Sequence, residues 1–182
     1  DESKPQVAVI VASGEIVDGE AKPGTIGSTT LTDLIRQVAN DDKVAAIVLR
    51  VDSGGGSMFA SEVISDELQV VRDKGKPVVA SMGSVAASGG YYISLPADEI
   101  WAAPSTISGS IGVGAVMPTF QRSLAELGVT IDGFGTTPLA GQMSPLRELG
   151  PSARELIDLS IRSAYDVFIG KVAKARKMDV AA

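Results

Sequence analysis

Apolar positions along the chain follow two patterns: short runs rich in valine and isoleucine, and longer stretches with helical spacing. Runs of the first kind are typical of strands, which we predict at Gln6–Ala12, Val44–Val51, Val78–Met82, Glu99–Ala103, Ile111–Val116 and Val129–Phe134. Apolar residues three or four positions apart predict helices over Thr30–Asn40, Met58–Asp73, Phe120–Leu127 and Pro151–Lys177. Because strands and helices alternate, we expect an α/β fold with a mostly parallel sheet, flanking helices and a long C-terminal helix.

Other segments refine this picture. The strand expected at Val44–Val51 is nearly all apolar, which predicts that both of its faces are covered. Ser13–Gly27 is acidic and glycine-rich, which indicates an exposed loop, and the absence of repeats or low-complexity linkers predicts a single domain over residues 1–182. The charge-free stretches Pro77–Ala97 and Ile100–Gln121 are long enough to cross a bilayer. Glycine, proline and serine interrupt both, so a buried core is the better interpretation.

Composition narrows the possible chemistry. The 182 residues include no cysteine and no histidine, and the formal net charge is −6. The lack of cysteine excludes disulfides and thiolate nucleophiles, and the lack of histidine excludes a Ser-His-Asp triad and imidazole metal sites. The negative charge argues against nucleic acid as a partner. We expect no metal and no cofactor, and a catalytic site built from Ser, Lys, Asp, Glu, Tyr or backbone groups.

A first glycine-rich segment, Asp52–Ser57 (DSGGGS), follows the strand expected at Val44–Val51. Its glycines can turn backbone N–H groups toward a phosphate, a carboxylate or an oxyanion. The segment matches neither a Walker A loop nor G-x-G-x-x-G. Taken alone, it is most simply a tight turn between a strand and a helix.

A second such segment, Ser84–Tyr92 (SVAASGGYY), follows the strand expected at Val78–Met82. Ser88 would lie at the beginning of a helix, near the positive end of its dipole, where the Gly89 N–H can bind an oxyanion. Taken alone, the segment favours Ser88 as a helix cap. Because parallel sheets place their sites at consecutive strand ends, the two segments together favour Ser88 as a nucleophile.

A nucleophilic serine needs a base, and without histidine that base would be a lysine whose pKa is lowered by desolvation. The lysines of the chain are Lys4, Lys22, Lys43, Lys74, Lys76, Lys171, Lys174 and Lys177. Each lies in a charged or terminal stretch, and none falls between Ser88 and Lys171. The residues therefore indicate a serine and backbone donors without an obvious base.

Three motifs occur in order: Arg50–Ser57 (RVDSGGGS), Ala86–Ile93 (AASGGYYI) and Ser108–Val113 (SGSIGV). Together they resemble the bacterial signal peptide peptidase A (protease IV) family, over about Val7–Lys177. The resemblance implies a ClpP/crotonase-like fold and the activity of a serine-lysine peptidase.

The resemblance also implies roles for single residues. Ser88 looks like the nucleophile, Gly55 and Gly89 would supply the oxyanion N–H groups, and Ser110 would orient the lysine ammonium. Taken without the family, Ser110 belongs to a plain turn. The first motif of the family usually reads Asn-Ser-Pro-Gly-Gly, so Asp52 and Gly54 depart from it, which puts the donor at Gly55 in doubt.

In short family members the lysine comes from a segment similar to Gly135–Ser144, which holds no lysine here. Long, tandem-domain members carry it in the N-terminal repeat. The chain is therefore similar to the C-terminal half of a long member, and we expect the base in the N-terminal half of the same protein.

The resemblance implies that the substrates are short hydrophobic peptides such as signal-peptide remnants. It also implies a ring-like homo-oligomer at the bacterial inner membrane, facing the periplasm and attached through a segment outside these residues. Two alternatives stay open. A crotonase-type acyl-CoA enzyme would need an acidic residue near the turns and a basic patch for the cofactor phosphates. A non-catalytic assembly or substrate-binding scaffold would use Ser88 as a cap only.

Overall fold

The computed structural model describes residues 4–137 and 139–181. The elements are β1 (Gln6–Ser13), β2 (Glu15–Val17), β3 (Thr25–Gly27), α1 (Ser28–Ala39), β4 (Val44–Ser53), α2 (Met58–Asp73), β5 (Val78–Ala87), α3 (Gly89–Tyr92), β6 (Glu99–Trp101), β7 (Ile107–Gly109), α4 (Gln121–Glu126) and α5 (Pro151–Arg176). The chain divides into two compact units, Asp1–Gly112 with Phe168–Ala182, and Val113–Val167. The single-domain organisation stays a prediction.

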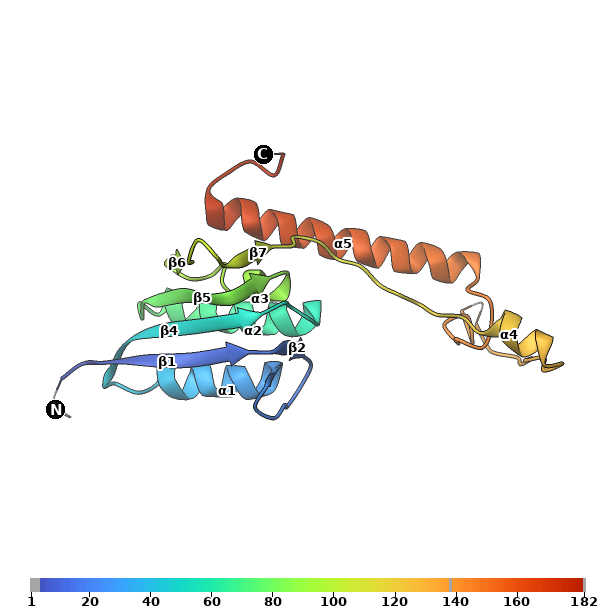
Figure 1. The fold of residues 1–182 in the computed structure, drawn as a ribbon, viewed down its shortest axis with the longest axis horizontal. Coiled ribbons are helices and arrows are strands. Elements are labelled where there is room, and N and C mark those ends of the chain that lie inside the picture. The colour runs from blue at the N-terminus through green and yellow to red at the C-terminus, as the bar shows by residue number, and fades with distance from the viewer. Residues whose placement is uncertain (1–3, 138, 182) are drawn as a thin grey trace. The chain divides into compact units, whose positions relative to one another are not determined.

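The first unit contains a parallel sheet in the order β1-β4-β5-β6, with β7 paired to the end of β5 (Figure 1). The expected α/β fold with a mostly parallel sheet and flanking helices is therefore confirmed. Because the strands run in the same direction, their carboxyl ends meet at one edge. β4, β5 and β7 all end there, and the candidate residues follow those ends.

Side chains alternate between a covered and an open face of this sheet. Ile47 and Leu49 of β4 are fully buried, whereas Val48 is half-buried and Arg50 is exposed. On the neighbouring edge strand β1, Val9 is 63% exposed. The prediction that both faces of β4 are covered is therefore wrong within the described residues, because the helices cover one face only.

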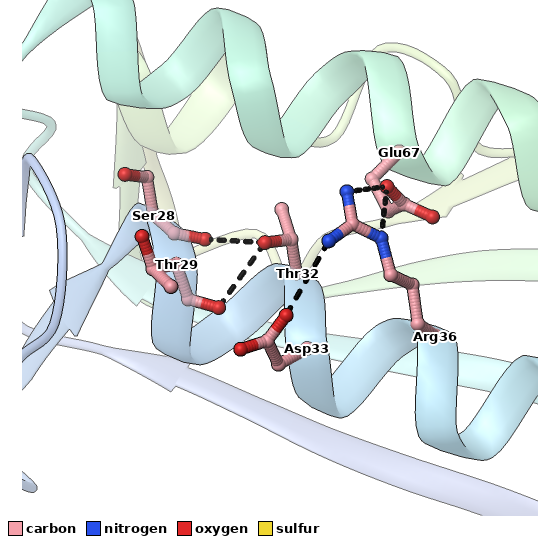
Figure 2. A network of polar contacts seen from close by, with 6 residues as sticks. All are labelled: Ser28, Thr29, Thr32, Asp33, Arg36 and Glu67. Atoms are coloured by element: carbon pink, nitrogen blue, oxygen red, sulfur yellow. Dashed lines mark hydrogen bonds and ion pairs between the residues drawn. The ribbon is translucent and has the colours of Figure 1, made fainter.

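An ion pair joins helices α1 and α2 (Figure 2). The Arg36 guanidinium of α1 lies 2.6 Å from the Glu67 carboxylate of α2 and 3.3 Å from that of Asp33. At the beginning of α1, the buried Thr32 hydroxyl donates to the carbonyl oxygens of Ser28 and Thr29. The Thr32 bonds satisfy a hydroxyl that burial would otherwise leave unpaired.

Three sequence predictions fail locally. Ser13–Gly27 is not simply a loop, because it contains β2 and β3, which pair in parallel and bury Ile16 and Ile26. Ile111–Val116 and Val129–Phe134 form no strands; the strand of that region is β7. Both segments lack a neighbouring strand to pair with, and apolar content alone does not make a strand. All four predicted helices are confirmed, and no helix among the described residues is long and apolar enough to cross a membrane.

We expect Leu49→Ala to lower the free energy of unfolding by about 2–5 kcal/mol, because a fully buried leucine leaves a cavity when truncated. Val9→Ala on the open face is the matched control and should cost less than about 1 kcal/mol. Urea denaturation followed by circular dichroism measures both. Equal losses would show that the face of Val9 is buried in solution.

Candidate active site

Ser88 and Ser110 follow the ends of two paired strands. The register places Ala87 of β5 opposite Gly109 of β7, and the Ser88 N–H donates to the Gly109 carbonyl oxygen at 2.8 Å. Each serine is therefore the first residue beyond its strand. The structure brings these two predicted site residues to neighbouring positions at the carboxyl edge of the sheet.

The backbone of Ser88 is strained. Its φ of 51° and ψ of −120° are values that residues other than glycine rarely adopt, and holding them costs about 1–3 kcal/mol. The Ser88 hydroxyl makes no capping bond to α3 and has no hydrogen-bond partner within residues 4–137 and 139–181. Interpreting Ser88 as a helix cap is therefore wrong. A partly exposed, unbonded hydroxyl on a strained turn is suited to attack a substrate.

The glycine-rich loop after β4 packs directly against this turn. A Cβ placed on Gly55 would lie 2.8 Å from the Ser88 Cβ and 2.7 Å from the Gly89 nitrogen. Gly55 also has a φ of +103°, which side chains disfavour. The two loops can approach this closely only because Gly55 has no side chain. Ser88, Gly55 and Gly89, which the sequence placed in one site, therefore lie together.

The Gly55 backbone is held on both sides. Its N–H donates to the buried Ser53 hydroxyl at 3.1 Å, and its carbonyl oxygen accepts from the Ile16 N–H at 2.9 Å. The Ile16 carbonyl oxygen in turn accepts from the Ser57 N–H at 2.8 Å. Sequence reasoning missed Ile16 and Ser53, because the three-residue strand Glu15–Val17 is too short to show a pattern. The proposed donor at Gly55 is thus engaged within its own loop.

Asp52 faces the neighbouring strand. Its Oδ1 accepts from the Val85 N–H at 3.0 Å, and a Cβ on Gly83 would lie 2.9 Å from its Cγ. The pairing of β4 and β5 shifts here, so that one residue of β4 lies opposite an irregular stretch of β5. Asp52 bridges this irregularity with its side chain.

Among the residues that the structure describes, no lysine is bonded to the Ser88 hydroxyl. Lys76 donates to the carbonyl oxygens of Val38 and Asp41, and Lys171 is paired with acidic side chains of α2. Within the described residues, no lysine is hydrogen-bonded to Ser88 or Ser110, and Ser110 is exposed with a φ of 52°. The same part of the chain has no group of three acidic, histidine or cysteine side chains placed to hold a metal.

A strained serine against a glycine-rich loop, at the carboxyl edge of a parallel sheet, is an arrangement suited to hydrolases that act through a nucleophile and an oxyanion hole. Residues 70–182 match the family model of peptidase family S49, a range that includes Ser88, Gly89 and Ser110 but not Gly55. The chain belongs to peptidase family S49. The resemblance to signal peptide peptidase A is thereby confirmed.

Its relatives are longer proteins. The chain is 52% identical to Protease 4 of Salmonella typhi and 42% identical to Protease 4 of Haemophilus influenzae, over 94% and 95% of its length. It is 34% identical to the putative signal peptide peptidase SppA of Enterococcus faecium over 80% of its length. The chain spans 28% of each Protease 4 and 42% of the third relative.

In the full-length parent protein, we expect Gly55→Ala to abolish covalent labelling of Ser88 by a serine-reactive phosphonate, because the added methyl group would displace Ser88 or Gly89. Gly54→Ala is the matched control: a Cβ there has no atom within 4 Å, so labelling should persist. The labelled fraction is measured by peptide mapping. If the Gly55→Ala variant were labelled to the same extent as the wild type, the close packing of the two loops would be contradicted.

Proposed function

We propose that this chain is the serine-bearing part of a serine-lysine peptidase in which Ser88 is the nucleophile. The observation that carries the proposal is the strained Ser88, whose unbonded hydroxyl lies against the backbone of Gly55 and Gly89. Membership of peptidase family S49 supports it, and because these 182 residues contain no cysteine, a nucleophilic side chain among them must be of another kind, such as serine.

In this mechanism a neutral lysine takes the Ser88 hydroxyl proton while Oγ attacks the scissile carbonyl carbon. The resulting oxyanion would bind the N–H of Gly89, and that of Gly55 once it turns from the Ser53 hydroxyl. Collapse of the tetrahedral intermediate breaks the C–N bond, and the leaving amine receives the proton from the lysine. Water, deprotonated by the same lysine, then hydrolyses the acyl-enzyme and restores Ser88.

We propose that the lysine comes from an N-terminal half of the same protein, with Ser110 orienting its ammonium. Two facts support this origin. The described lysines make no hydrogen bond to Ser88 or Ser110, and each Protease 4 relative has more than two thirds of its length outside the region that the chain matches. A lysine that enters the site from another segment would be shielded from water there, and this desolvation would lower its pKa toward neutrality.

We propose short hydrophobic peptides, such as signal-peptide remnants, as substrates. The residues next to Ser88 in the sequence are small and apolar (Ala86, Ala87, Gly89 and Gly90), a setting that suits small or aliphatic substrate side chains. One relative is named a putative signal peptide peptidase. Such a protein would act at the bacterial inner membrane, facing the periplasm and attached through a segment outside these residues.

We propose a homo-oligomer as the working form. Exposed apolar side chains in both units support further protein contacts: Val7, Val9 and Val11 on β1, and Val116, Leu127 and Phe134 in the second unit. Apolar surface of this kind is stabilised when a second protein surface covers it.

We expect a phosphonate probe to label Ser88 in the full-length parent protein and to leave this chain alone unlabelled, because the base is absent from the chain. Labelling should increase between about pH 6 and pH 10 as the lysine loses its proton. Peptide mapping locates the modified residue.

The matched controls are Ser88→Ala, which should lose the label, and Ser84→Ala on the same strand, which should keep it. Labelling of the isolated chain would place the base within these residues. A folded parent protein that stayed unmodified at Ser88 over the whole pH range would contradict the peptidase mechanism.

A further inference from the structure

The helix that follows Ser88 is too short to hold its own shape. α3 consists of Gly89–Tyr92, a single turn that begins with two glycines, and such a turn gains little from helix propensity. Its backbone bonds run from the Tyr92 N–H to the Ser88 carbonyl oxygen (2.9 Å) and from the Ile93 N–H to the Gly89 carbonyl oxygen (3.0 Å). The direction of the Gly89 N–H therefore depends on what anchors the end of this turn.

Tyr92 provides that anchor. Its side chain is fully buried, and its ring packs edge-on against Phe168 with centroids 4.9 Å apart. Its hydroxyl donates a hydrogen bond to Glu62 Oε2 on α2. Burial, and then the bond to Glu62, raises the pKa of the Tyr92 phenol, so the hydroxyl stays protonated and keeps donating at neutral pH.

Glu62 is itself fixed in place. The Lys171 ammonium of α5 lies 2.8 Å from Glu62 Oε2 and 3.2 Å from Asp66 Oδ1, and it stands 5.1 Å from the centre of the Tyr92 ring. This cation balances the Glu62 charge where the carboxylate is partly shielded from water. Glu62 is thus a charged acceptor held in a fixed direction, and it binds the Tyr92 hydroxyl more strongly than a neutral acceptor would.

The same helix also carries the other loop of the site. α2 is capped by Ser57, whose hydroxyl accepts from the Ala60 N–H and which ends the glycine-rich loop containing Gly55. Ser61, next to Glu62, lies against Gly89: a Cβ on Gly89 would be 2.6 Å from the Ser61 Oγ. A bond from α2 to Tyr92 therefore fixes the two glycine donors relative to each other.

We propose that Glu62 and Tyr92 are positioning residues for the Ser88 site, joined by a hydrogen bond that holds the Gly89 N–H in register with the Gly55 loop. This inference rests on the proposed function and adds two residues to it. Neither residue touches the substrate in this proposal, and both act through the α3 turn.

The test is a double-mutant cycle in the full-length parent protein, using Tyr92→Phe, Glu62→Leu and the double variant. The readouts are the rate of phosphonate labelling at Ser88, and kcat and KM for a hydrophobic peptide, at a temperature where thermal melts show every variant folded. Each single variant should slow labelling and lower kcat by about tenfold with little change in KM, because a misdirected donor weakens binding of the transition state alone. The double variant should be no slower than either single variant, since all three lack the same bond.

Glu62→Gln retains an acceptor for Tyr92 and should recover most of the rate, which also keeps the test informative if Glu62→Leu fails to fold. One matched control is Glu67→Gln, which changes another glutamate of α2 and weakens its ion pair with Arg36 of α1. The other is Tyr165→Phe at an exposed tyrosine of α5, and both variants should label like the wild type. Single variants that melt earlier yet label at the wild-type rate, or losses that multiply in the double variant, would overturn the positioning role. Absence of Ser88 labelling in the wild type would instead overturn the proposed function.

Discussion

The left-handed backbone of Ser88 is the constraint on which the rest of the site depends. A serine holds such a φ only when bonds on both sides enforce it, and here the Ser88 N–H is bonded to Gly109 and its carbonyl oxygen to the Tyr92 N–H. The Ser88 hydroxyl makes no hydrogen bond to the helix that it precedes, so the side chain does not serve as a cap. The turn also brings the backbone so close to the β4 loop that Gly55 and Gly90 tolerate no side chain.

These contacts make the site a property of three strand ends rather than of one loop. β4 carries the glycine-rich loop, β5 carries Ser88 and β7 carries the carbonyl group that holds Ser88. The irregular pairing between β4 and β5, bridged by Asp52, sets how far Ser88 extends beyond the loop. An acidic residue at this position therefore has a structural use: it accepts a backbone bond from Val85 and does not need to face the reacting atoms.

The sequence predicted the parts of the fold that have strong local signals. α2 runs from Met58 to Asp73 as expected, because its apolar face is regular and Ser57 caps it. The grouping of Ser88, Gly55 and Gly89 was also predictable, since parallel strand ends meet at one edge. Strands of three residues, such as the one containing Ile16, offer too few positions to show alternation. The bond between Glu62 and Tyr92 joins residues 30 positions apart, and periodicity carries no information on such pairs.

One proposed arrangement would account for two independent features of the chain. The open face of the sheet exposes the valines of β1, although contact between apolar side chains and water is unfavourable. The Ser88 hydroxyl has no basic partner among the described residues. A further protein surface, from the proposed N-terminal half or a neighbouring subunit, would cover the exposed valines and supply the basic partner of Ser88. The strained backbone of Ser88 is consistent with this arrangement, because this chain alone can hold the serine in position. Deprotonation of the serine would then require a lysine from another segment. Assembly and catalysis would then be coupled, since the peptidase would form a complete site only where both surfaces meet.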